Sequence, residues 1–159
     1  MQGTIACAAA FAIIWSGLGF FLHPFGSEPN YESVSRYLET SGHPDDPIFV
    51  WGNIPEIYWA SGKLPATKFL TTSFMIGNYP GRPQDEPTVD DTTKQAWADF
   101  YADFAEHPPR YLIDTSTSDV RGADKFPISS FPRLARIVAE QYHYDVTIDG
   151  YDIYVRNDT

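Results

Sequence analysis

Two carboxylates stand where an α/β sheet can carry out chemistry. Glu56 follows the apolar run 47–51, and Asp114 ends the strand-like run 110–114. Ligands of open parallel sheets bind beyond the carboxyl ends of the strands, and two carboxylates there can act together in glycoside hydrolysis. Each also has a structural interpretation, because Glu at a helix start is common and Asp114 can cap the loop that follows it. The sequence does not fix the distance between them.

Three more residues near the first carboxylate are candidates for binding. Trp51, Tyr58 and the neighbouring Trp59 could stack on a sugar ring, although aromatic residues at strand and helix spacing usually belong to a core. Gly52 ends the first strand, but its turn has neither a GxGxxG fingerprint nor a Walker lysine, so it is more simply a turn glycine. The candidate binding residues are therefore Trp51, Gly52, Glu56, Tyr58 and Asp114.

Motifs for a metal, a cofactor or a nucleophilic serine are missing from the sequence. The four histidines are far apart and form no HxH or HxxxH pair, and the single cysteine, Cys7, excludes a four-cysteine zinc site. No Gly-x-Ser-x-Gly elbow occurs. We expect no cofactor, no metal and no catalytic residue belonging to this chain alone.

The charge balance argues against nucleic acid as a partner. The chain has 11 basic and 21 acidic residues, a net charge of −10. Binding to a phosphate backbone needs clustered Lys and Arg that release counterions. An acidic surface that keeps the domain soluble is the simpler interpretation.

Helical and strand patterns alternate along residues 26–159. In the first half, spacing, caps and turns predict a helix carrying Tyr31, Val34 and Leu38, a strand over 47–51, a helix from Pro55 to Ser61, and a strand or extended segment over 68–75. In the second half they predict a helix with the stripe Trp97, Phe100, Tyr101 and Phe104, a strand over 110–114, and a helix carrying Leu134, Ile137 and Val138. Two strands over 144–148 and 151–155 then follow, joined by the turn Asp149-Gly150. This order predicts a single small three-layer α/β domain with a mainly parallel sheet and a C-terminal antiparallel hairpin.

Residues 1–25 contain an apolar stretch long enough to cross a bilayer. Residues 4–22 read TIACAAAFAIIWSGLGFFL and carry no charge, and at about 1.5 Å per residue they approach the roughly 30 Å hydrocarbon core. A cleaved signal peptide and a buried core helix are alternatives, but the first residues lack the usual Lys or Arg of a signal. We expect one retained transmembrane helix, typical of the last span of a longer protein, and membrane lipid as its partner.

Three short motifs in a fixed order resemble a known family. They are Ile48-Phe49-Val50-Trp51-Gly52 followed by Pro55-Glu56-Ile57-Tyr58, then Ser61-Gly62-Lys63-Leu64-Pro65-Ala66-Thr67-Lys68-Phe69, then His107-Pro108-Pro109-Arg110-Tyr111-Leu112-Ile113 with a C-terminal hairpin over 142–156. This order is similar to the C-terminal soluble domain of GT-C membrane glycosyltransferases, the group of dolichyl-phosphate-mannose protein mannosyltransferases and aminoarabinose transferases. The resemblance covers roughly residues 1 to 156.

The resemblance implies a domain on the extracytoplasmic side of a membrane, in a transferase that uses a polyprenyl-phosphate sugar. In the family the catalytic acid lies in the first external loop of a multi-helix membrane body, and no residue of this chain corresponds to it, so no catalytic residue is carried over. The domain would then act with such a membrane body and transfer no sugar alone. Two alternatives stay open: a membrane-anchored binding or interaction module without enzymatic activity, and an independent hydrolase using Glu56 and Asp114.

Overall fold

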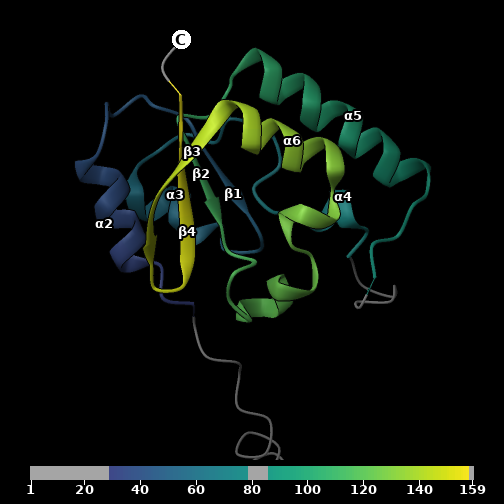
Figure 1. Cartoon of the computed structure of the whole chain (residues 1–159), viewed down its shortest axis with the longest axis horizontal. Helices are drawn as coiled ribbons and strands as arrows, with labels where there is room; N and C mark the ends of the chain where they lie inside the picture. Colours follow the sequence, from purple (N-terminus) through teal and green to yellow (C-terminus); the bar gives the residue numbers. More distant parts are fainter. Residues whose placement is uncertain (1–28, 79–85, 158–159) are drawn as a thin grey trace, which may run out of the picture.

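The computed structural model describes residues 29–78 and 86–157. The transmembrane helix predicted within residues 1–25 lies outside these ranges. Among the described residues, no helix has both the length and the apolar character to cross a membrane. The described chain begins at the lower end of the domain in Figure 1, and its C-terminal end is at the upper end.

A mixed four-stranded sheet forms the centre of the domain. Its strands are β1 (Ile48–Trp51), β2 (Tyr111–Asp114), β3 (Tyr142–Ile148) and β4 (Tyr151–Arg156). The order is β1-β2-β4-β3, with β1 and β2 parallel and the β2–β4 and β4–β3 pairs antiparallel. The expectation of a mainly parallel sheet is therefore wrong, because the C-terminal hairpin supplies half of the strands and places β4 directly beside β2.

The segment 68–75, expected as a strand or an extended segment, forms neither: bends and a turn lead into a short helix. Its backbone groups are bonded elsewhere: the Lys68 N–H donates to the Asp103 carboxylate at 3.0 Å, and the Thr72 N–H donates to the Gly52 carbonyl at 3.0 Å. The short helix α4 (Ser73–Ile76) follows. With no further strand beside it, β1 is an edge strand of the sheet.

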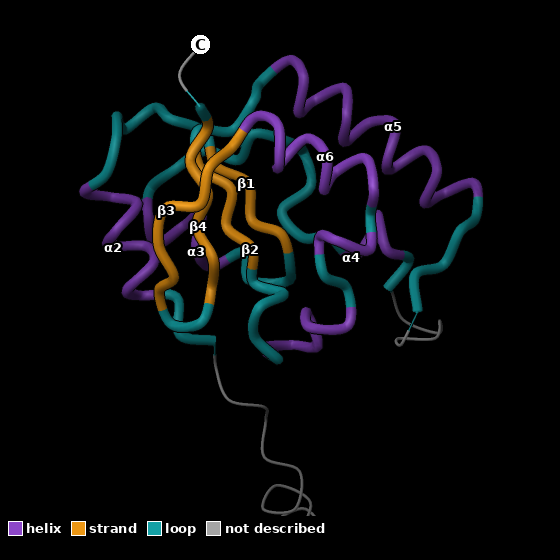
Figure 2. The backbone as a smooth tube through the Cα atoms, viewed as in Figure 1, coloured by secondary structure: helices purple, strands orange, loops and turns teal. Residues whose placement is uncertain are grey.

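Helices cover both faces of the sheet, as Figures 1 and 2 show, which confirms three layers. On one face lie α2 (Glu32–Thr40) and α3 (Glu56–Ser61), and on the other lie α4, α5 (Asp91–Glu106), α6 (Pro132–Gln141) and the short 3₁₀ helix η2 (Ile128–Ser130). A second 3₁₀ helix, η1 (Val120–Lys125), packs through Val120 with the α2–α3 half of the core. The structure confirms the predicted helices around Val34, Pro55, Phe100 and Leu134.

Strand alternation divides the core into two halves. Phe49, Trp51 and Leu112 face α5 and α6, whereas Val50 and Ile113 face α2 and α3. Since each face is covered, every residue of β1 and β2 is buried. This explains why both strands read as continuous apolar runs.

Local signals set the helix start and the hairpin turn. Asp90 and Thr93 form a reciprocal capping box at the start of α5. Asp149 and Gly150 have φ values of 53° and 84°, the left-handed pair that a type I′ hairpin requires. The predicted turn is confirmed.

Phe100 is the central contact of the larger half of the core. Its ring lies 5.0 Å from Phe49, 5.3 Å from Phe104 and 5.6 Å from Trp97. We expect Phe100→Ala to lower the free energy of unfolding by about 3–5 kcal/mol, measured by urea unfolding of the full chain. Val89→Ala, at a side chain that is 77% exposed, is the control and should change it by less than about 0.5 kcal/mol. Equal effects of the two substitutions would contradict this assignment.

Candidate functional site

The carboxyl ends of the two parallel strands meet in a very close contact. The Trp51 carbonyl accepts hydrogen bonds from the Thr115 N–H at 3.0 Å and from Thr115 Oγ1 at 2.8 Å. Gly52 has a φ of 137°, and a Cβ built on it would lie 1.9 Å from Thr115 Oγ1. Only glycine fits there, so Gly52 is a turn glycine that admits the neighbouring strand.

Trp51 is a core residue at the end of β1. It is 1% exposed, and its indole N–H donates to the Phe126 carbonyl at 2.8 Å. Its ring lies 5.0 Å from Phe131 and 6.0 Å from Trp97. Both the ring and its one polar atom are thus used inside the domain.

Tyr58 completes the outer edge of β1. Its hydroxyl accepts a hydrogen bond from the Val50 N–H at 2.9 Å, a group that no strand bonds. The side chain is 6% exposed, and burial strongly raises the pKa of the phenol. The hydroxyl therefore acts as a neutral partner for the backbone.

Glu56 forms a two-bond ion pair with Arg121. Oε1 lies 2.8 Å from Nη2 and Oε2 lies 3.1 Å from Nη1, and Nη1 also donates to the Asn53 carbonyl at 2.8 Å. The hydrogen bond from Arg121 lowers the pKa of Glu56. Arg121 is not among the candidates that the sequence suggests, and its only signal there is its place as the one basic residue of the polar stretch 115–124.

Asp114 caps the loop that follows β2. One carboxylate oxygen, Oδ1, accepts from the Ser116 N–H at 2.9 Å and from Ser116 Oγ at 2.6 Å. Burial raises the pKa of Asp114, and the nearby Asp152 raises it further, while the bonds from Ser116 lower it. Asp152 is the cross-strand partner of Asp114 on β4 and accepts from the Thr147 hydroxyl.

The five candidate residues do not form one cleft. Asp114 lies two residues after Leu112 and shares its face of the sheet, whereas Glu56 belongs to α3 on the opposite face. A cavity of about 10 Å³ at the end of β1 is lined by Trp51, Gly52 and Arg121 among others, but not by Glu56, Tyr58 or Asp114. That volume holds about one water molecule.

A further hollow in the described part of the chain is lined by other residues. A groove of about 430 Å³ on the α5 side is lined by Met75, Trp97 and Phe131 among others and contains none of the five. Within residues 29–78 and 86–157, no three His, Cys, Asp or Glu side chains are grouped as metal ligands would be.

Comparisons with protein-family models, with curated proteins and with solved structures give no match for this chain.

The close contact at Gly52 predicts a large difference between two glycine substitutions. Gly52→Ala should lower the free energy of unfolding by about 3 kcal/mol or more, because the new methyl group overlaps Thr115 and the φ is strained. Gly62→Ala is the matched control: Gly62 has a φ of 65° and nothing within 4 Å of an added Cβ, so we expect a loss of about 1 kcal/mol. Removal of the Thr115 hydroxyl in Gly52→Ala/Thr115→Ala should restore part of the stability. Equal losses for the two single variants would disprove the contact.

The buried carboxyl of Asp114 predicts a specific pH dependence. Because its folded-state pKa is raised, the group stabilises the fold below the unfolded pKa of about 3.9 and loses that contribution as pH rises through the folded pKa. The stability of the wild type relative to Asp114→Asn should therefore fall as the pH rises above about 4, as measured by urea unfolding. Ser116→Ala removes a bond that lowers this pKa and should move the change to higher pH. A relative stability that rises over this range would contradict the assignment.

Proposed function

We propose that this chain is the extracytoplasmic C-terminal domain of a polyprenyl-phosphate-sugar-dependent membrane glycosyltransferase. It is held at the membrane by a single N-terminal span and acts with a multi-helix membrane body. That body supplies the catalytic acid, and the domain alone transfers no sugar.

The observation that carries the proposal is that the resemblance motifs build one structural unit around β1. The strand ends at Trp51-Gly52, and Tyr58 of the next helix bonds back to it. The Ser-Gly pair ends α3, with Gly62 in the left-handed conformation. The following segment runs along β1, with Ile48 N–H bonded to the Leu64 carbonyl at 2.9 Å and Ala66 N–H bonded to the Ile48 carbonyl at 2.8 Å. The order of these motifs therefore corresponds to their positions around one strand. This supports the interpretation that they are a family signature rather than a chance similarity of short sequences.

The state of the carboxylates supports a role without catalysis in this chain. A hydrolase with two carboxylates needs both to face one substrate from opposite sides of the scissile bond. Here Glu56 is bonded to Arg121 and Asp114 to Ser116, on opposite faces of the sheet. This arrangement disfavours the independent hydrolase.

A membrane-anchored binding module is the second candidate. It is favoured by exposed apolar side chains on the outer side of β1, such as Trp59, which is 80% exposed. The two functions share the membrane attachment and differ in whether sugar transfer depends on the chain.

The test is loss and recovery of sugar transfer in native membranes. Membranes from the source cells with the gene disrupted should lose transfer of radiolabelled sugar from a polyprenyl-phosphate donor to endogenous acceptors. The full chain, added back by expression, should restore it, whereas the purified full chain in vesicles with the same donors should show none. Unchanged transfer after disruption would favour the binding module, and turnover by the purified chain would contradict a non-catalytic role.

A further inference from the structure

We propose that the domain rests on the lipid bilayer through the side that covers β1. The contacting surface, here called the apolar edge, consists of Trp59, Leu64, Leu70 and Phe74. This inference rests on the membrane attachment in the proposed function. It adds which surface of the domain contacts the lipid, and hence how the domain is oriented, because attachment by a helix alone does not determine either.

Large apolar side chains are exposed chiefly on this edge. Trp59 is 80% exposed, Leu64 66%, Phe74 56% and Leu70 47%. Among the described residues, the only other large hydrophobic residues with exposed side chains are Val89 and Tyr144. Four of six therefore come from sixteen consecutive residues, whereas single exposed apolar residues elsewhere need no explanation.

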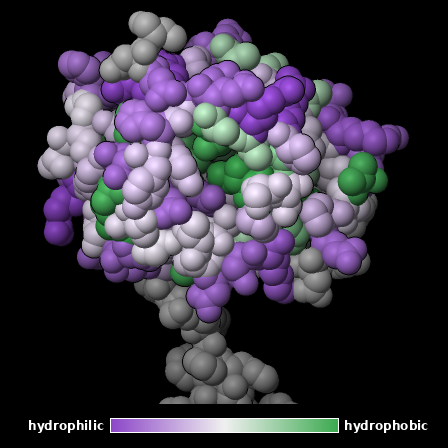
Figure 3. All heavy atoms as spheres, in the orientation of Figure 1, coloured by the Kyte–Doolittle hydropathy of each residue, from purple (hydrophilic) through white to green (hydrophobic). Residues whose placement is uncertain are grey.

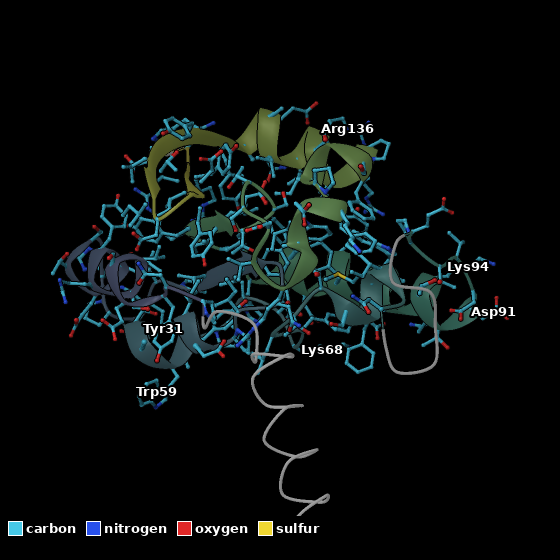
Figure 4. All side chains as sticks on the ribbon, turned by 90° about the horizontal axis from the view of Figure 1, so that it is seen from below. Tyr31, Trp59, Lys68, Asp91, Lys94 and Arg136 are labelled. Atoms are coloured by element: carbon cyan, nitrogen blue, oxygen red, sulfur yellow. The ribbon has the colours of Figure 1, made fainter. Side chains whose placement is uncertain are left out.

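These sixteen residues follow one side of the domain. They run from α3 through the segment bonded to β1 and into α4, and β1 is an edge strand, so they form the outer covering of the sheet at that edge. Figure 4 shows Trp59 pointing outward, with Lys68 on the same side, away from α6 and Arg136. The face seen in Figure 3 is mostly hydrophilic or neutral at its surface, with one hydrophobic area near its centre.

The distribution of charged residues also favours contact between this edge and lipid. Residues 57–78 contain no Asp or Glu, in a chain with 21 acidic residues. The Lys63 ammonium is buried and donates to the His43 carbonyl at 2.6 Å, and Lys68 is paired with Asp99 at 2.8 Å. Both lysines of the segment thus have partners, and the exposed Trp suits the bilayer interface. This pattern favours insertion between neutral headgroups over attraction to anionic lipid.

The length of chain before the domain brings a bilayer within reach. Residues 4–22 are uncharged, and six residues, 23–28, connect them to the described chain, a reach of at most about 20 Å. The described chain leads at once into α2, which packs against α3, the helix that carries Trp59. Figure 4 places Tyr31, at the start of α2, on the same side as Trp59. The position of this part of the chain beside Trp59 favours lipid over a protein partner or a second copy as the occupant of the apolar edge.

Site-directed spin labelling of the full chain in phosphatidylcholine vesicles tests the inference. In a Cys7→Ser background, a nitroxide is attached at Leu70→Cys on the apolar edge. The matched control is Tyr144→Cys on β3, the opposite edge of the sheet, where the native side chain is 55% exposed. Collision rates with oxygen and with a water-soluble nickel chelate report depth. We expect the ratio of oxygen to nickel accessibility to be several-fold higher at position 70 than at position 144.

Flotation of the same samples separates the possible failures. If the chain floats with the vesicles and both labels are equally accessible to nickel, the docking surface is wrong while the attachment stands. If the chain does not float with the vesicles, the membrane attachment is wrong and the inference falls with it. Spin–spin broadening at position 70 that disappears on dilution with unlabelled chain would show that a second copy covers the edge, which also overturns the proposal.

Discussion

The main-chain oxygen of Trp51, the last residue of β1, accepts hydrogen bonds from Thr115, the residue that follows β2. This contact joins the carboxyl ends of the two parallel strands, and the surrounding structure depends on it. Thr115 bonds to this oxygen through both its amide and its hydroxyl, and the approach is possible only because Gly52 has no Cβ. The neighbouring segments converge on the same point. Phe126 accepts from the indole of Trp51, and Thr72 donates to the Gly52 carbonyl at the start of α4. These contacts bring four segments of the chain together at Trp51 and Gly52.

This convergence has a consequence for function. In open α/β domains the carboxyl ends of the strands are the usual ligand site, but here the polar groups at those ends bond to one another. Glu56 is held by Arg121 and Asp114 by Ser116, and the cavity beside Trp51 and Gly52 has a volume of only about 10 Å³. These contacts motivate a proposed function that depends on a membrane partner, with the outer side of β1 as the surface turned toward lipid.

Local patterns predicted most of the elements and the pairing of the C-terminal hairpin, but not that β4 of this hairpin lies beside β2. The helix stripe of α5, the buried strand runs and the Asp149-Gly150 turn all depend on neighbouring residues, and all are confirmed. The prediction for segment 68–75 was wrong because its apolar spacing fits a strand as well as a coil. Its conformation depends on hydrogen bonds to distant residues, such as that to Asp103 on α5. The strand order and the Glu56–Arg121 pair, 65 residues apart, likewise depend on long-range contacts that single-sequence spacing does not contain. The core interpretation is confirmed for Trp51 and Tyr58 but is wrong for Trp59, which is 80% exposed. The binding role proposed for Trp51 and Tyr58 stays a prediction.

The central claim is that the carboxyl end of β1 is rigid core rather than an adaptable ligand site. Amide hydrogen exchange of the full chain, resolved residue by residue, tests it directly. The Thr115 N–H bonded to Trp51 and the Val50 N–H bonded to Tyr58 should exchange only through global unfolding, with the same free energy of opening as Leu112 in the middle of β2. Exchange of Thr115 and Val50 through local opening, at a free energy several kcal/mol below that of Leu112, would contradict the account.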